Sequence, residues 1–225
     1  MEQSGQLTDA IHQVALWSLP ILAAVIFHEV AHGAMALRLG DDTAQRLGRL
    51  TLNPLPHIDP IGTVLMPGLL LLAGAPVFGY ARPVPVDYGQ LRNPKRDMVW
   101  VALAGPGTNL ILAVASALLF RFLAAQLEGV TEATATAFTL GVTLPLAQMA
   151  QVSVIINVSL AVFNLLPLPP LDGGRVLTGI LPYAQARLVA AIEPFGFLIL
   201  VGLIMTGSLR SIINGPIDFV MRVLL

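Results

Sequence analysis

Three apolar stretches constrain the fold of this 225-residue chain more than any other feature. Residues 14–37, 98–125 and 136–166 each exceed the roughly 20 apolar residues that a helix needs to cross a hydrocarbon core of about 30 Å. Charged residues make up only 11% of the chain, against about 25% in soluble domains. We therefore expect an all-α integral membrane protein, built as a polytopic helix bundle.

Three weaker segments raise the expected total to about five to six membrane segments. Residues 187–206 are a further apolar run, and the tail 209–225 is short and broken by Gly215-Pro216. Residues 62–80 are apolar but contain Pro67, Pro76 and several glycines, so we expect this segment to re-enter the membrane rather than cross it.

The distribution of basic residues agrees with re-entry. Residues 38–60, 81–97 and 167–187 each contain Lys or Arg, whereas residues 1–13 and 126–135 contain none. Cytoplasmic loops are enriched in basic residues, and a re-entrant 62–80 would place all three basic loops on the cytoplasmic side.

The chain has no internal repeat and no sign of a second domain, so we expect one membrane-embedded domain over 1–225. Its core spans about 14–185, and the tail 186–225 is less defined. Residues 48–52 alternate apolar and polar side chains, and residues 80–86 have extended character because prolines bias their predecessors away from helix. They are expected either as a small membrane-associated β-element or as irregular loops.

Composition also excludes several classes of function. The chain has no cysteine, so disulfides and thiol nucleophiles are excluded, and its net charge of −1 offers no basic surface for nucleic acid. The N-terminus lacks the basic residues of a cleaved signal peptide, so the first apolar stretch is expected to stay in the protein.

The candidate chemistry begins with His28-Glu29-Val30-Ala31-His32 inside the first apolar stretch. Residues four apart lie on one face of a helix, so both imidazoles can bind one Zn²⁺. Glu29 can then take a proton from zinc-activated water and pass it to the leaving amine. The alternative is a pair of structural histidines, but each charge in the membrane interior costs roughly 2.5–3.5 kcal/mol or more, which favours a functional role.

Two histidines leave zinc without a third protein ligand, and Asp172 is the candidate. It follows the 136–166 stretch in Leu171-Asp172-Gly173-Gly174, beside Pro167, Pro169 and Pro170. Prolines interrupt the helix and glycines allow close backbone approach. Taken alone, this motif is more typical of a simple turn with a solvated carboxylate.

Together, the two motifs resemble those of the site-2 protease family, the M50-type intramembrane zinc metalloproteases. The first is His28-Glu29-x-x-His32 in a membrane helix, and the second is Asn164-Leu165-Leu166-Pro167-x-Pro169-x-x-Asp172-Gly173. The intervening motifs are similar to the compact bacterial branch without PDZ or CBS domain: Gly48-Arg49-x-Thr51-Leu52-Asn53-Pro54, His57-Ile58-Asp59-Pro60, Arg92-Asn93-Pro94-Lys95 and Gly105-x-x-x-Asn109.

The resemblance implies a role for each matching residue. His28, His32 and Asp172 would bind one Zn²⁺ per chain, and Glu29 would be the general base and acid. Asn164 would stabilise the oxyanion, although a helix-end hydrogen bond explains it too. Gly105 and Asn109 would bind substrate, although Gly105 also fits a helix-packing seam.

Two further ionisable residues receive no role in the chemistry. His57 lies in a loop beside Pro56 and stays outside the metal set. Glu193 lies at the start of the 187–206 run and is expected either to gate access or to face water at a helix end.

The resulting prediction is an intramembrane zinc metalloprotease in a bacterial inner membrane, with its active site toward the cytoplasm. Its partners would be the bilayer and membrane-protein or signal-peptide-remnant substrates; the sequence does not predict an oligomeric state. A membrane metal transporter or metal-binding scaffold is the alternative function.

Overall fold

The computed structural model describes residues 2–72, 74, 79–131 and 134–225. All regular structure in these ranges is helical. The α-helices are α1 (Glu2–Leu39), α2 (Thr43–Arg46), α3 (Met66–Leu72), α4 (Pro94–Leu127), α5 (Leu144–Asn164), α6 (Asp172–Ile180), α7 (Tyr183–Ala190), α8 (Glu193–Met205) and α9 (Ser208–Leu224). Short 3₁₀ turns occupy Leu55–His57 (η1) and Tyr88–Gln90 (η3), and π-helical turns occupy Pro60–Leu65 (η2) and Thr139–Thr143 (η4).

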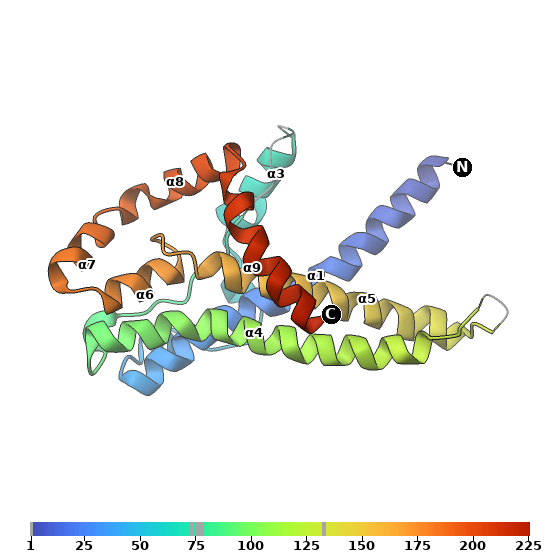
Figure 1. The fold of residues 1–225 in the computed structure, drawn as a ribbon, viewed down its shortest axis with the longest axis horizontal. Helices are drawn as coiled ribbons and strands as arrows, with labels where there is room; N and C mark the ends of the chain where they lie inside the picture. Colours follow the sequence, from blue (N-terminus) through green and yellow to red (C-terminus); the bar gives the residue numbers. More distant parts are fainter. Residues whose placement is uncertain (1, 73, 75–78, 132–133) are drawn as a thin grey trace.

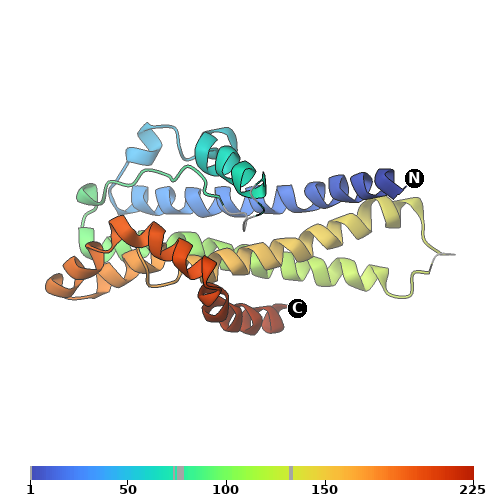
Figure 2. The ribbon, with the colours of Figure 1, turned by 90° about the horizontal axis from the view of Figure 1, so that it is seen from above.

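Three long helices, α1, α4 and α5, lie side by side and form the centre of the molecule (Figures 1 and 2). Ala113 and Ala117 of α4 pack against Val154 and Val158 of α5, and all four are between 0% and 3% exposed. Small side chains at such a seam let two helices approach closely. Helix α9 covers this seam with Ile217, Val220, Met221 and Leu224.

The candidate membrane spans are fewer than predicted. His12–Leu39, Pro94–Leu127 and Thr139–Asn164 are each long and apolar enough to cross a bilayer. Helices α7 and α8 make a fourth candidate only as a pair bent by 58°. In the described part of the chain there are thus three or four candidate spans instead of five to six. Composition misled the count because Pro194 interrupts the 187–206 run, and α9 is only 17 residues long.

The 62–80 segment leaves the body of the protein and returns to the same point. Its helical part ends at Leu72, and residues 73 and 75–78 lie outside the described ranges. The Tyr80 amide donates to the Gly62 carbonyl at 3.1 Å, and the Thr63 hydroxyl donates to the Tyr80 carbonyl at 2.9 Å. Because its two ends are hydrogen-bonded to each other, the segment begins and ends at the same height along the helix bundle.

Residues 80–86, which we call the strap, run extended across α1. The predicted β-element of 48–52 and 80–86 does not form, since no strand occurs in the described chain. The reason lies in the strap's few amide donors. Pro83 and Pro85 have no N–H, the Arg82 amide donates to the His57 carbonyl, and the Val84 amide donates to the Glu29 carboxylate.

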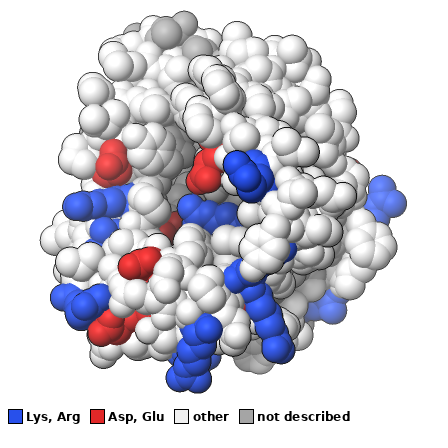
Figure 3. Space-filling model, turned by 90° about the vertical axis from the view of Figure 1, so that its left-hand side faces the viewer, with Lys and Arg blue, Asp and Glu red and all other residues white. Residues whose placement is uncertain are grey.

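The three basic loops meet at one end of the helix bundle. Figure 3 shows lysines and arginines gathered on this end, with fewer acidic side chains between them. Several hydrogen bonds join the loops directly, among them those from the Arg92 amide to the Leu39 carbonyl and from Lys95 Nζ to the Leu181 carbonyl. The N-terminus and the connection from α4 to α5 lie at the opposite end (Figure 1).

Candidate metal centre

His28 and His32 lie one turn apart on α1, and their side chains converge inside the bundle. Their Nε2 atoms are 3.0 Å apart, and the two residues are 7% and 9% exposed. This convergence follows from the four-residue spacing, which places both side chains on one face of the helix.

Asp172, the first residue of α6, reaches the histidine pair from a distant part of the sequence. Its Oδ2 atom is 3.2 Å from His28 Nε2 and 3.3 Å from His32 Nε2. The following glycine makes this approach achievable, because a Cβ on Gly173 would lie 2.3 Å from the carbonyl oxygens of Leu165 and Leu166. The backbone therefore folds back tightly between α5 and α6.

The chemistry of these three atoms fits a cation. His28 Nδ1 is 2.6 Å from Asn109 Oδ1, and His32 Nδ1 is 2.7 Å from the Val101 carbonyl oxygen. Because these oxygens accept hydrogen bonds, each imidazole carries its proton on Nδ1 and points a lone pair from Nε2. Asp172 Oδ2 is buried and has no hydrogen-bond donor. Three electron-pair donors in such proximity suit Zn²⁺, which takes three protein ligands at catalytic sites and leaves a fourth position open.

Gly105 of α4 lies directly against both imidazoles. A Cβ at this position would be 2.4 Å from His32 Nε2 and 2.6 Å from His28 Cε1. Gly105 therefore provides the room that the two histidines occupy, and its part in substrate binding stays a prediction.

Asn109, the other predicted substrate-binding residue, is enclosed by protein. It is 0% exposed, and its amide faces His28, the Ala24 carbonyl and Asn157. The side chain therefore lies behind the candidate ligand His28, and its part in substrate binding stays a prediction.

Glu29 lies beside the three candidate ligands but is not one of the three converging side chains. Its Oε2 atom accepts a hydrogen bond from the Val84 amide of the strap at 2.7 Å. A partly exposed carboxylate that is held by one backbone donor keeps its other oxygen available for proton transfer.

Comparisons with known proteins agree with this arrangement. Residues 16–206 match the model of Peptidase family M50. The chain belongs to this family. A Bacillus subtilis protein named "Putative zinc metalloprotease YwhC" is 38% identical over 84% of this chain and 79% of its own length. "Putative zinc metalloprotease Rip2" of Mycolicibacterium smegmatis is 32% identical over 84% of this chain and 66% of its own length. No solved structure shows significant similarity.

Family membership and the apolar helices identify this M50 peptidase as an integral membrane protein and a zinc metalloprotease. Its candidate zinc ligands come from α1 and from the start of α6.

Helix α6 is attached to η3, the turn that follows the strap. Arg175 Nη1 of α6 donates to the Tyr88 hydroxyl of η3 at 2.8 Å. Burial raises the pKa of Tyr88 above its usual range despite the neighbouring Arg175, so the phenol stays neutral and accepts this bond.

Three other residues singled out in the sequence are not members of the cluster of three candidate ligands. Asn164 ends α5, where its Nδ2 donates to the Leu160 carbonyl at 3.0 Å, the helix-end alternative considered above. His57 is 3% exposed, its Nε2 faces the Thr51 carbonyl oxygen at 2.9 Å, and it is not part of the metal cluster. Glu193 is exposed at the N-terminus of α8, where the helix dipole favours a negative charge.

Arg49 is a functional candidate in the M50 peptidase that our sequence reasoning missed. It is 9% exposed, and its Nη2 donates to the carbonyls of Arg82 at 2.9 Å and Pro83 at 3.3 Å. The guanidinium thus holds the strap just before Val84, the residue that binds Glu29. The sequence signal for Arg49 was its place in the Gly48-Arg49-x-Thr51 motif, which gave it no role.

Replacing Arg49 with glutamine is expected to loosen the strap, because a hydrogen bond from a charged donor contributes about 1.5–3 kcal/mol. Hydrogen exchange of residues 80–86 should become faster and cleavage slower, with the zinc content unchanged. The matched control is Arg46→Gln, since Arg46 pairs with Asp42 at the surface (3.0 Å) and such pairs contribute little. Equal exchange rates in the wild type and Arg49→Gln would contradict this role.

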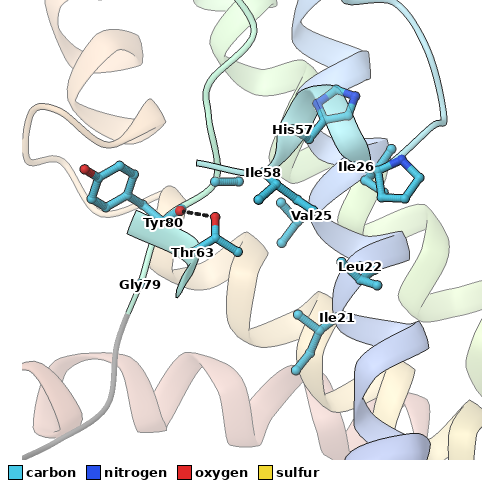
Figure 4. A pocket seen from close by; sticks show the side chains of 11 residues that line it. Ile21, Leu22, Val25, Ile26, His57, Ile58, Thr63, Gly79 and Tyr80 are labelled. Atoms are coloured by element: carbon cyan, nitrogen blue, oxygen red, sulfur yellow. Dashed lines mark hydrogen bonds between the residues drawn. The ribbon is translucent and has the colours of Figure 1, made fainter. Parts of the chain in front are cut away.

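An apolar groove of about 370 Å³ lies between α1 and the point where the strap begins (Figure 4). Figure 4 shows α1 side chains on one side of it, and Thr63 hydrogen-bonded to Tyr80 on the other. Val25 and Ile26 precede Glu29 by one turn, so the groove runs along the α1 face that also carries the candidate base. The lining residues are Ile21, Leu22, Val25, Ile26, Pro54, His57, Ile58, Thr63, Gly79, Tyr80 and Ala81.

Proposed function

We propose that this M50 peptidase hydrolyses peptide bonds within or close to transmembrane segments of other membrane proteins. The observation that supports this proposal is the position of His28, Glu29 and His32 inside the candidate span His12–Leu39. Ionisable residues within a membrane span are costly and mark functional sites. A protease centre in this span is suited to substrates that also lie in the bilayer.

Each site residue has a proposed role. His28, His32 and Asp172 hold one Zn²⁺, which when bound acidifies a coordinated water and polarises the peptide carbonyl. Glu29 accepts the proton of the attacking water and delivers it to the leaving amine. Asn164 donates its side-chain amide to the developing oxyanion, and for this it exchanges its bond to the Leu160 carbonyl for the substrate.

The groove and the strap support a binding site for an unwound substrate. A transmembrane helix must open locally before its backbone can be attacked, and the freed peptide groups then need new partners because lipid offers none. The groove would receive an apolar side chain next to Glu29, and the adjacent strap is extended, so the backbone groups that Glu29, Arg49, His57 and Gly62 do not occupy can pair with a peptide. Substrates of this kind include single-span membrane proteins and remnants of signal peptides.

We propose that the basic end of the molecule faces the cytoplasm of a bacterium, with the protein in the inner membrane. The gathering of basic loops at one end supports this orientation. In that orientation the 62–80 segment enters from the cytoplasmic side and returns to it, because its ends are hydrogen-bonded together. The whole chain 1–225 would then act as a single membrane-embedded domain.

The test is cleavage of a membrane substrate by the full-length protein in liposomes. A single-span substrate with an apolar helix should be cut at a site that mass spectrometry places within or next to that helix. Removal of zinc by a chelator should stop cleavage, and added Zn²⁺ should restore it. Cleavage confined to water-exposed loops far from the helix would contradict the intramembrane proposal.

The same liposomes test the transporter alternative. A metal transporter would move Zn²⁺ across the membrane down a gradient, which a fluorescent zinc indicator inside the liposomes would report. We expect no protein-dependent zinc influx, because family membership favours a zinc metalloprotease over a transporter.

A further inference from the structure

Two buried asparagines connect His28 to the interior of the helix bundle. Asn109 of α4 is 0% exposed and Asn157 of α5 is 1% exposed. Asn109 Nδ2 lies 3.1 Å from the Ala24 carbonyl oxygen and 2.8 Å from Asn157 Oδ1. Asn157 Nδ2 in turn lies 2.9 Å from the Ser153 carbonyl oxygen. The chain of contacts therefore joins α1, α4 and α5 behind the candidate metal site.

Backbone carbonyls determine the direction of every hydrogen bond in this series of contacts from His28 to Ser153. The Ser153 carbonyl can only accept, so Asn157 must present Nδ2 to it and Oδ1 to Asn109. Asn109 must then present Nδ2 to both Asn157 and the Ala24 carbonyl, which leaves its Oδ1 facing His28 Nδ1 at 2.6 Å. With an acceptor in this position, His28 is protonated at Nδ1.

We infer that Asn109 and Asn157 are positioning residues that hold His28 in the tautomer and orientation needed to bind the metal. This inference rests on the proposed zinc site. Asn109 acts directly on His28, and Asn157 acts through Asn109 by fixing which end of its amide faces the imidazole. His32 needs no asparagine partner, because the Val101 carbonyl accepts the hydrogen bond from its Nδ1.

The polar surroundings explain why an amide pair is needed at this depth. Protein encloses the Nδ1 side of His28, since Asn109 is 0% exposed and Asn157 is 1% exposed, so the ring adopts the state that these protein partners allow. A simple interhelical contact would not require the amide oxygen to face the histidine. The position of that oxygen on His28 Nδ1 is what distinguishes a metal-positioning role from helix packing alone.

The experiment measures zinc affinity of the purified full-length protein by competition with a chromophoric chelator. The variants are Asn109→Ala, which removes the acceptor, Asn109→Asp, which keeps an oxygen facing His28, and Asn157→Ala. The matched control is Ser116→Ala, which removes another contact between α4 and α5, the part-buried 2.8 Å bond to Ser153 Oγ, and leaves the Asn157 bond to the Ser153 carbonyl in place. The absorption spectrum of the Co²⁺-substituted protein reports ligand geometry independently of activity.

Loss of an outer partner of a ligating histidine typically weakens metal binding by about 10–100-fold. We expect a loss in that range for Asn109→Ala, with an altered cobalt spectrum. Asn109→Asp should lose less than Asn109→Ala, because one carboxylate oxygen can still accept the hydrogen bond from His28 Nδ1. Asn157→Ala should lose less than Asn109→Ala, and the double variant should lose no more than Asn109→Ala, since both act on one contact.

Two results would overturn the inference: wild-type zinc affinity and cobalt spectrum in Asn109→Ala, or equal losses in Asn109→Ala, Asn109→Asp and Ser116→Ala. The latter would indicate general helix packing. These outcomes are separate from the fate of the proposed function. Suppose that the variants show the expected losses of zinc affinity but the wild-type protein cuts no membrane substrate. The inference about Asn109 and Asn157 would then stand, and the proposed intramembrane protease activity would be refuted.

Discussion

Replacing Glu29 with glutamine is expected to stop peptide cleavage while the protein keeps its zinc. The carboxylate is the proposed base, and removing such a group lowers the rate by about 10²–10⁴-fold. Zinc should remain because the three converging ligand atoms belong to His28, His32 and Asp172. The fold should remain too, because the glutamine carbonyl can still accept the bond from the Val84 amide. The measurements are single-turnover cleavage in liposomes and zinc content by elemental analysis.

Glu193→Gln is the matched control for Glu29→Gln. Both remove one carboxylate charge, but Glu193 is exposed at the start of α8, so its variant should cleave at the wild-type rate. A Glu29→Gln protein that cleaves as fast as the wild type would assign the base to another group. Loss of zinc together with activity would instead indicate that Glu29 supports the metal itself.

Gly105→Ala is expected to disrupt the zinc site, although it adds only one methyl group. The new Cβ would lie 2.4 Å from His32 Nε2 and 2.6 Å from His28 Cε1. The proposed metal ligands themselves must move to relieve this clash, and a misplacement of about 1 Å at a reacting centre can cost about 100-fold in rate. We expect zinc affinity and cleavage to fall together by at least about that factor.

Gly107→Ala provides a close comparison on the same helix. A Cβ at Gly107 meets no atom within 4 Å, and alanine is about 1 kcal/mol better than glycine within a helix. This variant should bind zinc and cleave as the wild type does, with equal or higher thermal stability. If Gly105→Ala behaved like Gly107→Ala in zinc titrations, the close packing of Gly105 against the histidines would not matter for metal binding.

Much of the helical architecture was predictable because lipid imposes simple rules on sequence. The long apolar stretches 14–37, 98–125 and 136–166 coincide with the three candidate spans. The fate of the interrupted stretches was not predictable from composition. Whether a proline ends a helix, bends it or starts the next one depends on contacts far away, as for the bend between α7 and α8. The strap shows the same limit, since its extended residues bind a side chain and a turn instead of another strand.

Part of the candidate site was likewise predictable from the sequence, and part was not. The spacing of His28 and His32 determines their common face, and the structure brings Asp172 within 3.3 Å of both Nε2 atoms. The ligand roles of these three residues stay predictions until zinc is measured. The partners of the histidines could not be read from the sequence, because Asn109, Asn157 and the Val101 carbonyl approach from other helices. A polar amide within the apolar 144–164 run was the only advance signal for Asn157.

The hydrogen bonds behind His28 and His32 also restrict how a polypeptide can reach the ion. Separating α1 from α4 would break the contacts of Asn109 with Ala24 and of His32 with Val101. On the opposite flank of α1, one bond from the Val84 amide holds the strap to Glu29. A chain admitted on that flank leaves the imidazoles undisturbed. If a substrate enters on that flank, its admission and the retention of the metal would depend on different hydrogen bonds.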